Sequence, residues 1–292
     1  MADAAGGFEE GAVSSNPVLG QDPWRQNAAA SPYQGQYSQP QWQGGQVGGH
    51  QQAPPTYGAP VAAATDRMTI DDVVMKTLTL LGVVLVSGAA AWTLLPAPVA
   101  GLALFGALGV GLILGLVIAF KQVTNPAVIL TYAVAEGVLL GLVSKVYESL
   151  YSGIVLQAVV ATFSVFAGMA ALYKFKVIRA TPKFTRWLSG AVLGLFGLMI
   201  VNFGLSLFGV NDGAGLGLRA GVTGEVNTLA IVFSLVCIGV AALTFIQDFA
   251  VVEEGVARGV ERRYGWYASF GILVGLIWLY LEILRLLSYL RR

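Results

Sequence analysis

The chain has 292 residues, of which 56% are hydrophobic and only 11% are charged, with a formal net charge of +1. Soluble domains carry roughly 25% charged residues, so this composition excludes a soluble globular protein and indicates a polytopic membrane protein. The near-neutral charge gives no indication of a nucleic-acid partner. The single cysteine, Cys237, excludes an internal disulfide and a zinc site built from thiolates.

Residues 1–67 form a polar region rich in Gly, Gln, Pro, Ala, Ser and Tyr. Without periodic apolar residues such a region cannot offset its ordering entropy, so we expect a disordered cytoplasmic tail. No apolar stretch follows a basic start, which excludes a signal peptide. Two interpretations stay open, a solubilising tail and a docking segment for a protein partner.

Residues 68–292 contain seven apolar segments, each long enough for a membrane-spanning helix. Open strands cannot satisfy their backbone in lipid, so we expect an all-α fold, a bundle of seven transmembrane helices. Thr69, with Asp71 and Asp72 in the first turn, is a helix-start signal. The expected segments are 73–95, 99–120, 126–146, 154–173, 187–208, 229–252 and 266–290. Four small-xxx-small pairs favour close helix packing in lipid: Gly111–Gly115, Gly137–Gly141, Gly190–Gly194 and Gly271–Gly275.

Lysine and arginine are concentrated in the loops after the second, fourth and sixth segments, whereas the alternate loops hold almost none. Basic residues favour the cytoplasmic side, so we expect a plasma-membrane protein with a cytoplasmic N-terminus and an extracytoplasmic C-terminus. The basic residues of the rich loops are Lys121, Lys174, Lys176, Arg179, Lys183, Arg186, Arg258, Arg262 and Arg263.

Three predicted helices each contain one carboxylate: Glu136 in the third, Asp248 in the sixth and Glu282 in the seventh. An ionisable side chain inside a bilayer costs roughly 3 kcal/mol on insertion scales, so each needs a partner or water. Asp248 could reach the interface, and Glu282 could pair with Arg285, three residues further on the same helical face. Glu136 has no local partner within a turn, which favours a water-filled cavity or a shared proton.

The stretch LYLEILRLLSYL resembles the LYLDIINLFLYLLR signature that closes the Bax inhibitor-1 family, and TFIQDF stands where that family has an aspartate ending its sixth helix. The polar tail, MTIDDVV and YAVAEGVLLG resemble its actinobacterial branch. The resemblance covers residues 70–292 and implies a pH-sensitive calcium leak with a carboxylate pair as its sensor. By position the pair is Asp248 and Glu282, which would also carry Ca²⁺ in transit. Lys121 would be the basic latch residue of the pair, with Arg285 a second candidate.

Two carboxylates at hydrogen-bond distance in a poorly solvated site share one proton near neutral pH. The protonated pair ties two helices together, whereas the deprotonated pair repels and offers oxygen ligands to Ca²⁺ or another cation. The sequence leaves open whether Glu282 pairs with Asp248 or with Glu136.

We expect no enzymatic activity and no cofactor. The only histidine, His50, lies in the tail, which excludes a histidine-dependent membrane hydrolase. Neither Asp248 nor Glu282 lies in the Gly-x-Gly-Asp stretch of an aspartyl intramembrane protease, and the glycine-rich residues 211–217 predict a flexible loop. The alternative function is a non-transporting membrane adaptor that recruits a partner through its tail.

Overall fold

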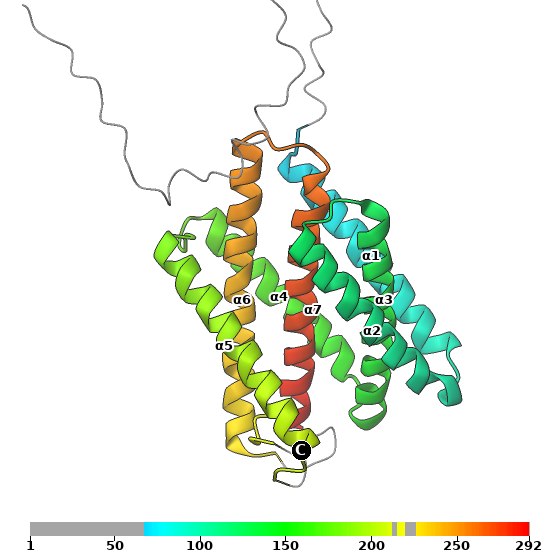
Figure 1. Ribbon diagram of the computed structural model, residues 1–292. Helices are drawn as coiled ribbons and strands as arrows, with labels where there is room; N and C mark the ends of the chain where they lie inside the picture. The colour runs from blue at the N-terminus through cyan, green and yellow to red at the C-terminus, as the bar shows by residue number, and fades with distance from the viewer. Residues whose placement is uncertain (1–66, 212–214, 220–225, 292) are drawn as a thin grey trace, which may run out of the picture. The chain divides into compact units, whose positions relative to one another are not determined.

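The computed structural model describes residues 67–211, 215–219 and 226–291, and these residues form seven α-helices and no β-strand (Figure 1). The expected all-α, seven-helix fold is confirmed. Residues 1–66 of the predicted tail, with His50, lie outside the described residues. The helices are α1 (Ile70–Leu94), α2 (Ala97–Lys121), α3 (Pro126–Leu150), α4 (Ile154–Lys174), α5 (Pro182–Leu207), α6 (Thr228–Ala257) and α7 (Tyr264–Leu290).

Local capping signals set the helix ends. The Thr69 side chain accepts a hydrogen bond from the Asp72 N–H at 3.1 Å and begins α1, as its sequence signal predicts. Thr181 caps α5 in the same way, with Pro182 as the first helical residue. The fifth helix therefore begins five residues earlier than expected, because its first turn is polar and only its cap marks it.

All seven helices have the length and apolarity of membrane-spanning helices. Large apolar side chains on the outer helices point away from the bundle, including Leu102 and Phe105 of α2 and Leu193 of α5. Such a surface would be unfavourable in water but suits the hydrocarbon of a bilayer. The chain is a multi-pass membrane protein.

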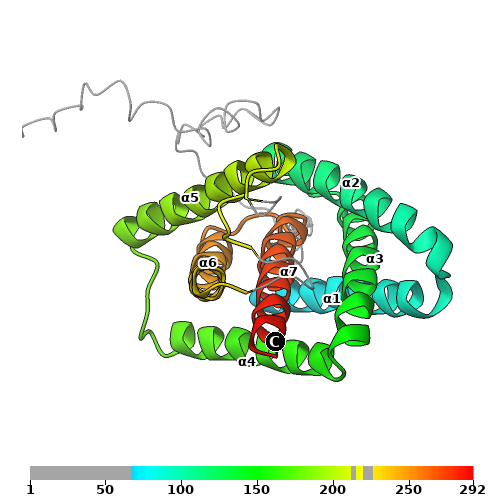
Figure 2. The same ribbon diagram turned by 90° about the horizontal axis from the view of Figure 1, so that it is seen from below.

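Helix α7 stands in the middle of the bundle, with the other helices around it (Figure 2). It packs against α1, α3, α4 and α6, and 15 of its 27 residues are buried. The described part of the chain is thus organised around the last helix. A charged side chain on the buried face of this helix needs a counter-charge or hydrogen bonds from inside the bundle.

Glycines allow the closest helix contacts. On α3, a Cβ at Gly137 would lie 2.6 Å from the Val84 carbonyl oxygen of α1, and a Cβ at Gly141 would lie 2.8 Å from Gly88 Cα. The predicted role of the Gly137–Gly141 pair in close packing is therefore confirmed. The Gly190–Gly194 pair of α5 instead faces open space, since nothing lies within 4 Å of a Cβ at either position.

Candidate functional site

The carboxylate of Glu282 is buried inside the bundle and is neutralised by two arginines. Its side chain is 2% exposed. Oε1 accepts hydrogen bonds from Arg219 Nη2 at 2.6 Å and from Arg285 Nη1 at 3.0 Å, and Ser234 of α6 donates to Oε2 at 3.4 Å. Two positive charges face this one negative charge, so Glu282 serves as the anionic half of an ion-paired cluster and not as a free ligand for a cation.

Arg219 reaches Glu282 from the connector between α5 and α6. Asn202 accepts a hydrogen bond from a backbone N–H of this connector at 2.8 Å, and Asn227 donates to one of its carbonyls at 3.1 Å. These contacts hold residues 215–219 in place and aim the guanidinium at α7. Sequence reasoning missed this role, although Arg219 is the only basic residue between α5 and α6.

Asp248 of α6 carries a carboxylate for which the described residues provide no counter-charge. Its half-buried side chain faces α7, where a Cβ on Gly271 would lie 3.7 Å from Oδ1. No ion pair between described residues involves it. Helix α6 continues for nine residues beyond it, or about 14 Å. Asp248 therefore lies more than two turns inside the helix and not at its end.

The structure does not bring Asp248 and Glu282 together, which corrects the expectation of a carboxylate pair between α6 and α7. Asp248 faces Gly271, and the eleven residues from there to Glu282 span about 16 Å of α7. Ser234, which contacts Glu282, lies 14 residues before Asp248 on α6. The expectation is wrong because α6 continues to Ala257 before a short loop leads into α7. Asp248 therefore lies beside Gly271, three turns of α7 before Glu282.

Glu136 also does not pair with Glu282. A Cβ on Gly111 of α2 would lie 2.8 Å from Glu136 Oε1, so the carboxylate faces α2. Tyr132, one turn earlier on α3, is the polar side chain that interacts with it. The Gly111–Gly115 pair thus leaves room on α2 for a glutamate and a tyrosine of α3, and the alternative pairing of Glu136 with Glu282 is not present.

Glu136 and Asp248 instead lie in the same part of the bundle. The rings of Tyr132 and Phe270 meet edge-on with centroids 5.0 Å apart, which fixes the level of α3 against α7. Glu136 follows Tyr132 by one turn, and Asp248 faces Gly271, the residue after Phe270. Two carboxylates without arginine or lysine partners in the described residues therefore occupy the half of the bundle that contains the start of α7.

The two latch candidates differ in position. Arg285 bonds Glu282, as the local alternative predicts. Lys121 ends α2 with an exposed side chain, and no ion pair in the described part of the chain joins it to Asp248 or to any other acid. A lysine at the end of a membrane helix extends its ammonium toward the interface, which explains its position without a latch.

A second charged cluster joins the start of α1 to the loop before α7. Lys76 is 9% exposed and donates to Asp72 at 2.5 Å and to the Arg262 carbonyl at 2.6 Å, while Arg262 Nε donates to the other Asp72 oxygen at 2.9 Å. The ammonium also lies 5.6 Å from the Trp266 ring centroid. This network, which the sequence did not reveal, joins the two segments at one end of the bundle through a single carboxylate shared by two cations.

The described residues contain no group of three or more His, Cys, Asp or Glu side chains that could hold a metal ion. Asp248 and Glu282, expected to carry Ca²⁺ together, are too far apart to bind one ion.

Comparison with known proteins places this chain in a family. The family model described as Bax inhibitor 1 like matches residues 16–292, which is nearly the whole chain. No curated protein matches it. The match covers all seven helices and the three intramembrane carboxylates.

Proposed function

The chain belongs to the Bax inhibitor 1 like family, and we propose that it is a pH-sensitive leak that lets Ca²⁺ or a similar cation pass downhill through the plasma membrane. Under this proposal the N-terminus is cytoplasmic, the C-terminus is extracytoplasmic, and the protein transports ions and catalyses no reaction. The bilayer is its solvent, since all seven helices have the length and apolarity to span it.

The uncompensated carboxylate of Asp248 carries the proposal. A structural bundle would neutralise or eliminate such a group, because an ionised side chain inside the membrane costs roughly 3 kcal/mol on insertion scales. The same bundle does neutralise Glu282, with two arginines. An acid left without a counter-charge on the central α6–α7 interface is instead suited to exchange a proton for a cation.

The sign of the pH response follows from this exchange. At low pH the protonated Asp248 is neutral and compatible with a closed apolar interface. As pH rises the carboxylate ionises, and its charge favours the entry of water and of a hard cation with oxygen ligands. Glu136 adds a second acid in the same half of the bundle. Flux should therefore increase with pH, through acids that titrate one by one and not through a proton shared with Glu282.

Flux through liposomes tests the proposal. The full-length protein is reconstituted with a Ca²⁺ indicator inside, and the initial rate of Ca²⁺ entry is measured in a series of pH steps. One titrating acid allows at most about a tenfold rise in rate per pH unit. Asp248→Asn should remove most of the pH response, and Glu136→Gln should reduce it. Glu254→Gln is the matched control on α6, since that exposed acid pairs with Arg258 at the end of the helix, and it should leave the profile unchanged.

Several outcomes would contradict the proposal. An unchanged profile in Asp248→Asn together with a flat one in Glu282→Gln would restore Glu282 as the sensor. An altered profile in Lys121→Met would restore the latch, because the structure predicts no change there. If no preparation passes Ca²⁺, the leak proposal fails and the adaptor alternative takes its place. Deleting residues 1–65 separates the two functions, since a leak should survive the deletion and partner recruitment should not.

A further inference from the structure

A groove runs between α1 and α4, which both pack against α7 but not closely against each other. Two cavities make up this groove, a smaller one of about 370 Å³ and a larger one of about 960 Å³. Leu81 of α1 and Phe163 of α4 line both, so the cavities adjoin at these two side chains. The groove is therefore continuous along much of the bundle.

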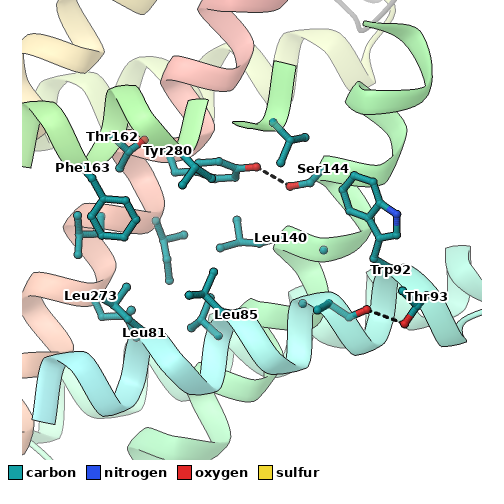
Figure 3. A pocket seen from close by; sticks show the side chains of 18 residues that line it. Leu81, Leu85, Trp92, Thr93, Leu140, Ser144, Thr162, Phe163, Leu273 and Tyr280 are labelled. Atoms are coloured by element: carbon teal, nitrogen blue, oxygen red, sulfur yellow. Dashed lines mark hydrogen bonds between the residues drawn. The ribbon is translucent and has the colours of Figure 1, made fainter. Parts of the chain in front are cut away.

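The smaller cavity is lined by apolar side chains and by hydroxyl groups that are already satisfied. Ser144 and Tyr280 bond each other at 2.6 Å (Figure 3). Thr93 and Thr162 each donate to the backbone carbonyl four residues earlier, at 2.8 Å and 2.7 Å. Because these hydroxyls need no further partner, this part of the groove suits a hydrocarbon chain and not a polar ligand.

Thr77 lines the larger cavity, but protein atoms enclose its hydroxyl oxygen. Thr77 is 7% exposed, and its Oγ1 is buried without a hydrogen bond to any described residue. A helical threonine usually donates to the carbonyl four residues earlier, but here the Val73 carbonyl accepts from Ser269 at 3.0 Å. A buried hydroxyl without a partner is rare in native proteins.

Three basic residues line the same cavity at the end of α4 and in the connector after it: Lys174, Lys176 and Arg179. None of them forms an ion pair with a described acid. The only acid in the lining, Glu253, accepts a hydrogen bond from the Tyr173 hydroxyl. The positive charge at this rim is thus in excess, and it suits an anionic group.

We propose that this groove binds an anionic phospholipid. Its phosphate would contact Lys176 and Arg179, and one acyl chain would lie along the apolar part. This site does not depend on the proposed leak.

The length of the groove favours a lipid over a free anion. Its lining on α1 continues from Thr77 to Trp92, fifteen residues or about 22 Å. The hydrocarbon of one leaflet is about 15 Å deep, so the groove accommodates an acyl chain. A free phosphate could use the basic rim but would leave the rest of the groove without a ligand.

Native mass spectrometry of the full-length protein in detergent tests the site. Phosphatidylglycerol and phosphatidylcholine with identical acyl chains are titrated separately, and bound copies are counted. The wild type should bind one phosphatidylglycerol about tenfold or more tightly than phosphatidylcholine, as expected for two basic contacts. Lys176→Gln/Arg179→Gln should lose this preference. Lys183→Gln/Arg186→Gln removes the same charge from the start of α5, outside the groove lining, and should keep it.

Filling the groove separates a specific site from a general attraction to the basic surface. Ala170 lines the larger cavity, whereas Ala167, one turn earlier on α4, is exposed outside it. Ala170→Trp should abolish the tightly bound lipid, and Ala167→Trp should not. Gel filtration compares both variants with wild type and reveals a folding defect. If Ala170→Trp does not fold, the smaller substitution Ala170→Leu takes its place.

The same titrations contain the results that would overturn the proposal. Equal binding of the two lipids by the wild type would remove the anionic site. Equal losses in the two charge-pair variants would show that surface charge alone attracts the lipid. Displacement of the lipid by inorganic phosphate would identify an anion site without a role for the apolar groove. None of these results bears on Ca²⁺ flux, so the failure of this site and the failure of the leak are distinguishable.

Discussion

Glu282 and Asp248 are acids of one membrane bundle in opposite electrostatic surroundings. The buried Glu282 carboxylate accepts hydrogen bonds from Arg219, Arg285 and Ser234 in place of water. Asp248 has no such bonds in the described part of the chain and keeps partial exposure. Removing one member of a buried ion pair leaves the charge of the other member uncompensated. Removing an unpaired charge leaves no partner without its counter-charge. The two positions should therefore respond to the same chemical change in opposite ways.

We predict that Glu282→Gln lowers the free energy of unfolding by about 1–3 kcal/mol, less than for a fully buried pair because both arginines are about one-quarter exposed. Asp248→Asn should be neutral or stabilising at neutral pH, because an amide is easier to bury than a carboxylate. Thermal unfolding in detergent measures both. Equal destabilisation by the two variants would contradict the assignment of Glu282 as paired and Asp248 as unpaired.

At the scale of elements, α1 and α3 cross with almost no side chain between them. Gly141 faces Gly88 so closely that a methyl group at position 141 would collide with backbone atoms, which cannot move away without separating the helices. Glycine in a helix is otherwise unfavourable by roughly 0.5–1 kcal/mol relative to alanine. Close packing in lipid offsets that cost at the crossing, while no contact offsets it at Gly190.

Alanine at these two glycines should therefore have opposite effects. Gly141→Ala should lower the unfolding free energy by about 1–3 kcal/mol through overpacking. Gly190→Ala, the same change on α5, should be neutral or should stabilise by up to about 1 kcal/mol. The unfolding temperatures of both variants in detergent, compared with wild type, check this. A loss of stability at Gly190 as large as at Gly141 would show that the glycines matter for something other than the α1–α3 contact.

At the scale of the whole molecule, orientation in the membrane depends on which loops are basic. The connector between α4 and α5 contains Lys176 and Arg179, and the helix ends beside it add Lys174, Lys183 and Arg186, whereas the loop between α3 and α4 contains no lysine or arginine. Such residues remain on the cytoplasmic side. Helix α4 separates these two connections, so they lie on opposite sides of a bilayer that it spans.

Cysteine labelling should reveal that orientation. In a Cys237→Ser background, Val177→Cys places a thiol in the basic connector and Ser152→Cys places one in the loop before α4, and both positions are exposed. A membrane-impermeant maleimide added to intact cells should label Ser152→Cys and should label Val177→Cys only after lysis. The reverse pattern would place the N-terminus outside and would contradict the orientation proposed for the leak.

The sequence by itself determined the elements that depend on local properties. A bilayer requires each spanning segment to be apolar, about 20 residues long and internally hydrogen-bonded, so seven helices could be predicted. The family could be predicted from the local motifs LYLEILRLLSYL and TFIQDF. The contact between Arg285 and Glu282 could be predicted too, because residues three apart share one helical face.

Only the tertiary structure decided the partners of the acids. Glu282 accepts its shortest hydrogen bond from Arg219, 63 residues away in a connector whose path no helical pattern predicts. The separation of Asp248 from Glu282 depends on the register of α6 against α7, which is set where Phe245 packs onto Gly275, with a Cβ there only 2.9 Å from the ring. Register and connector paths are properties of packing in three dimensions, and spacing along one helix does not contain them.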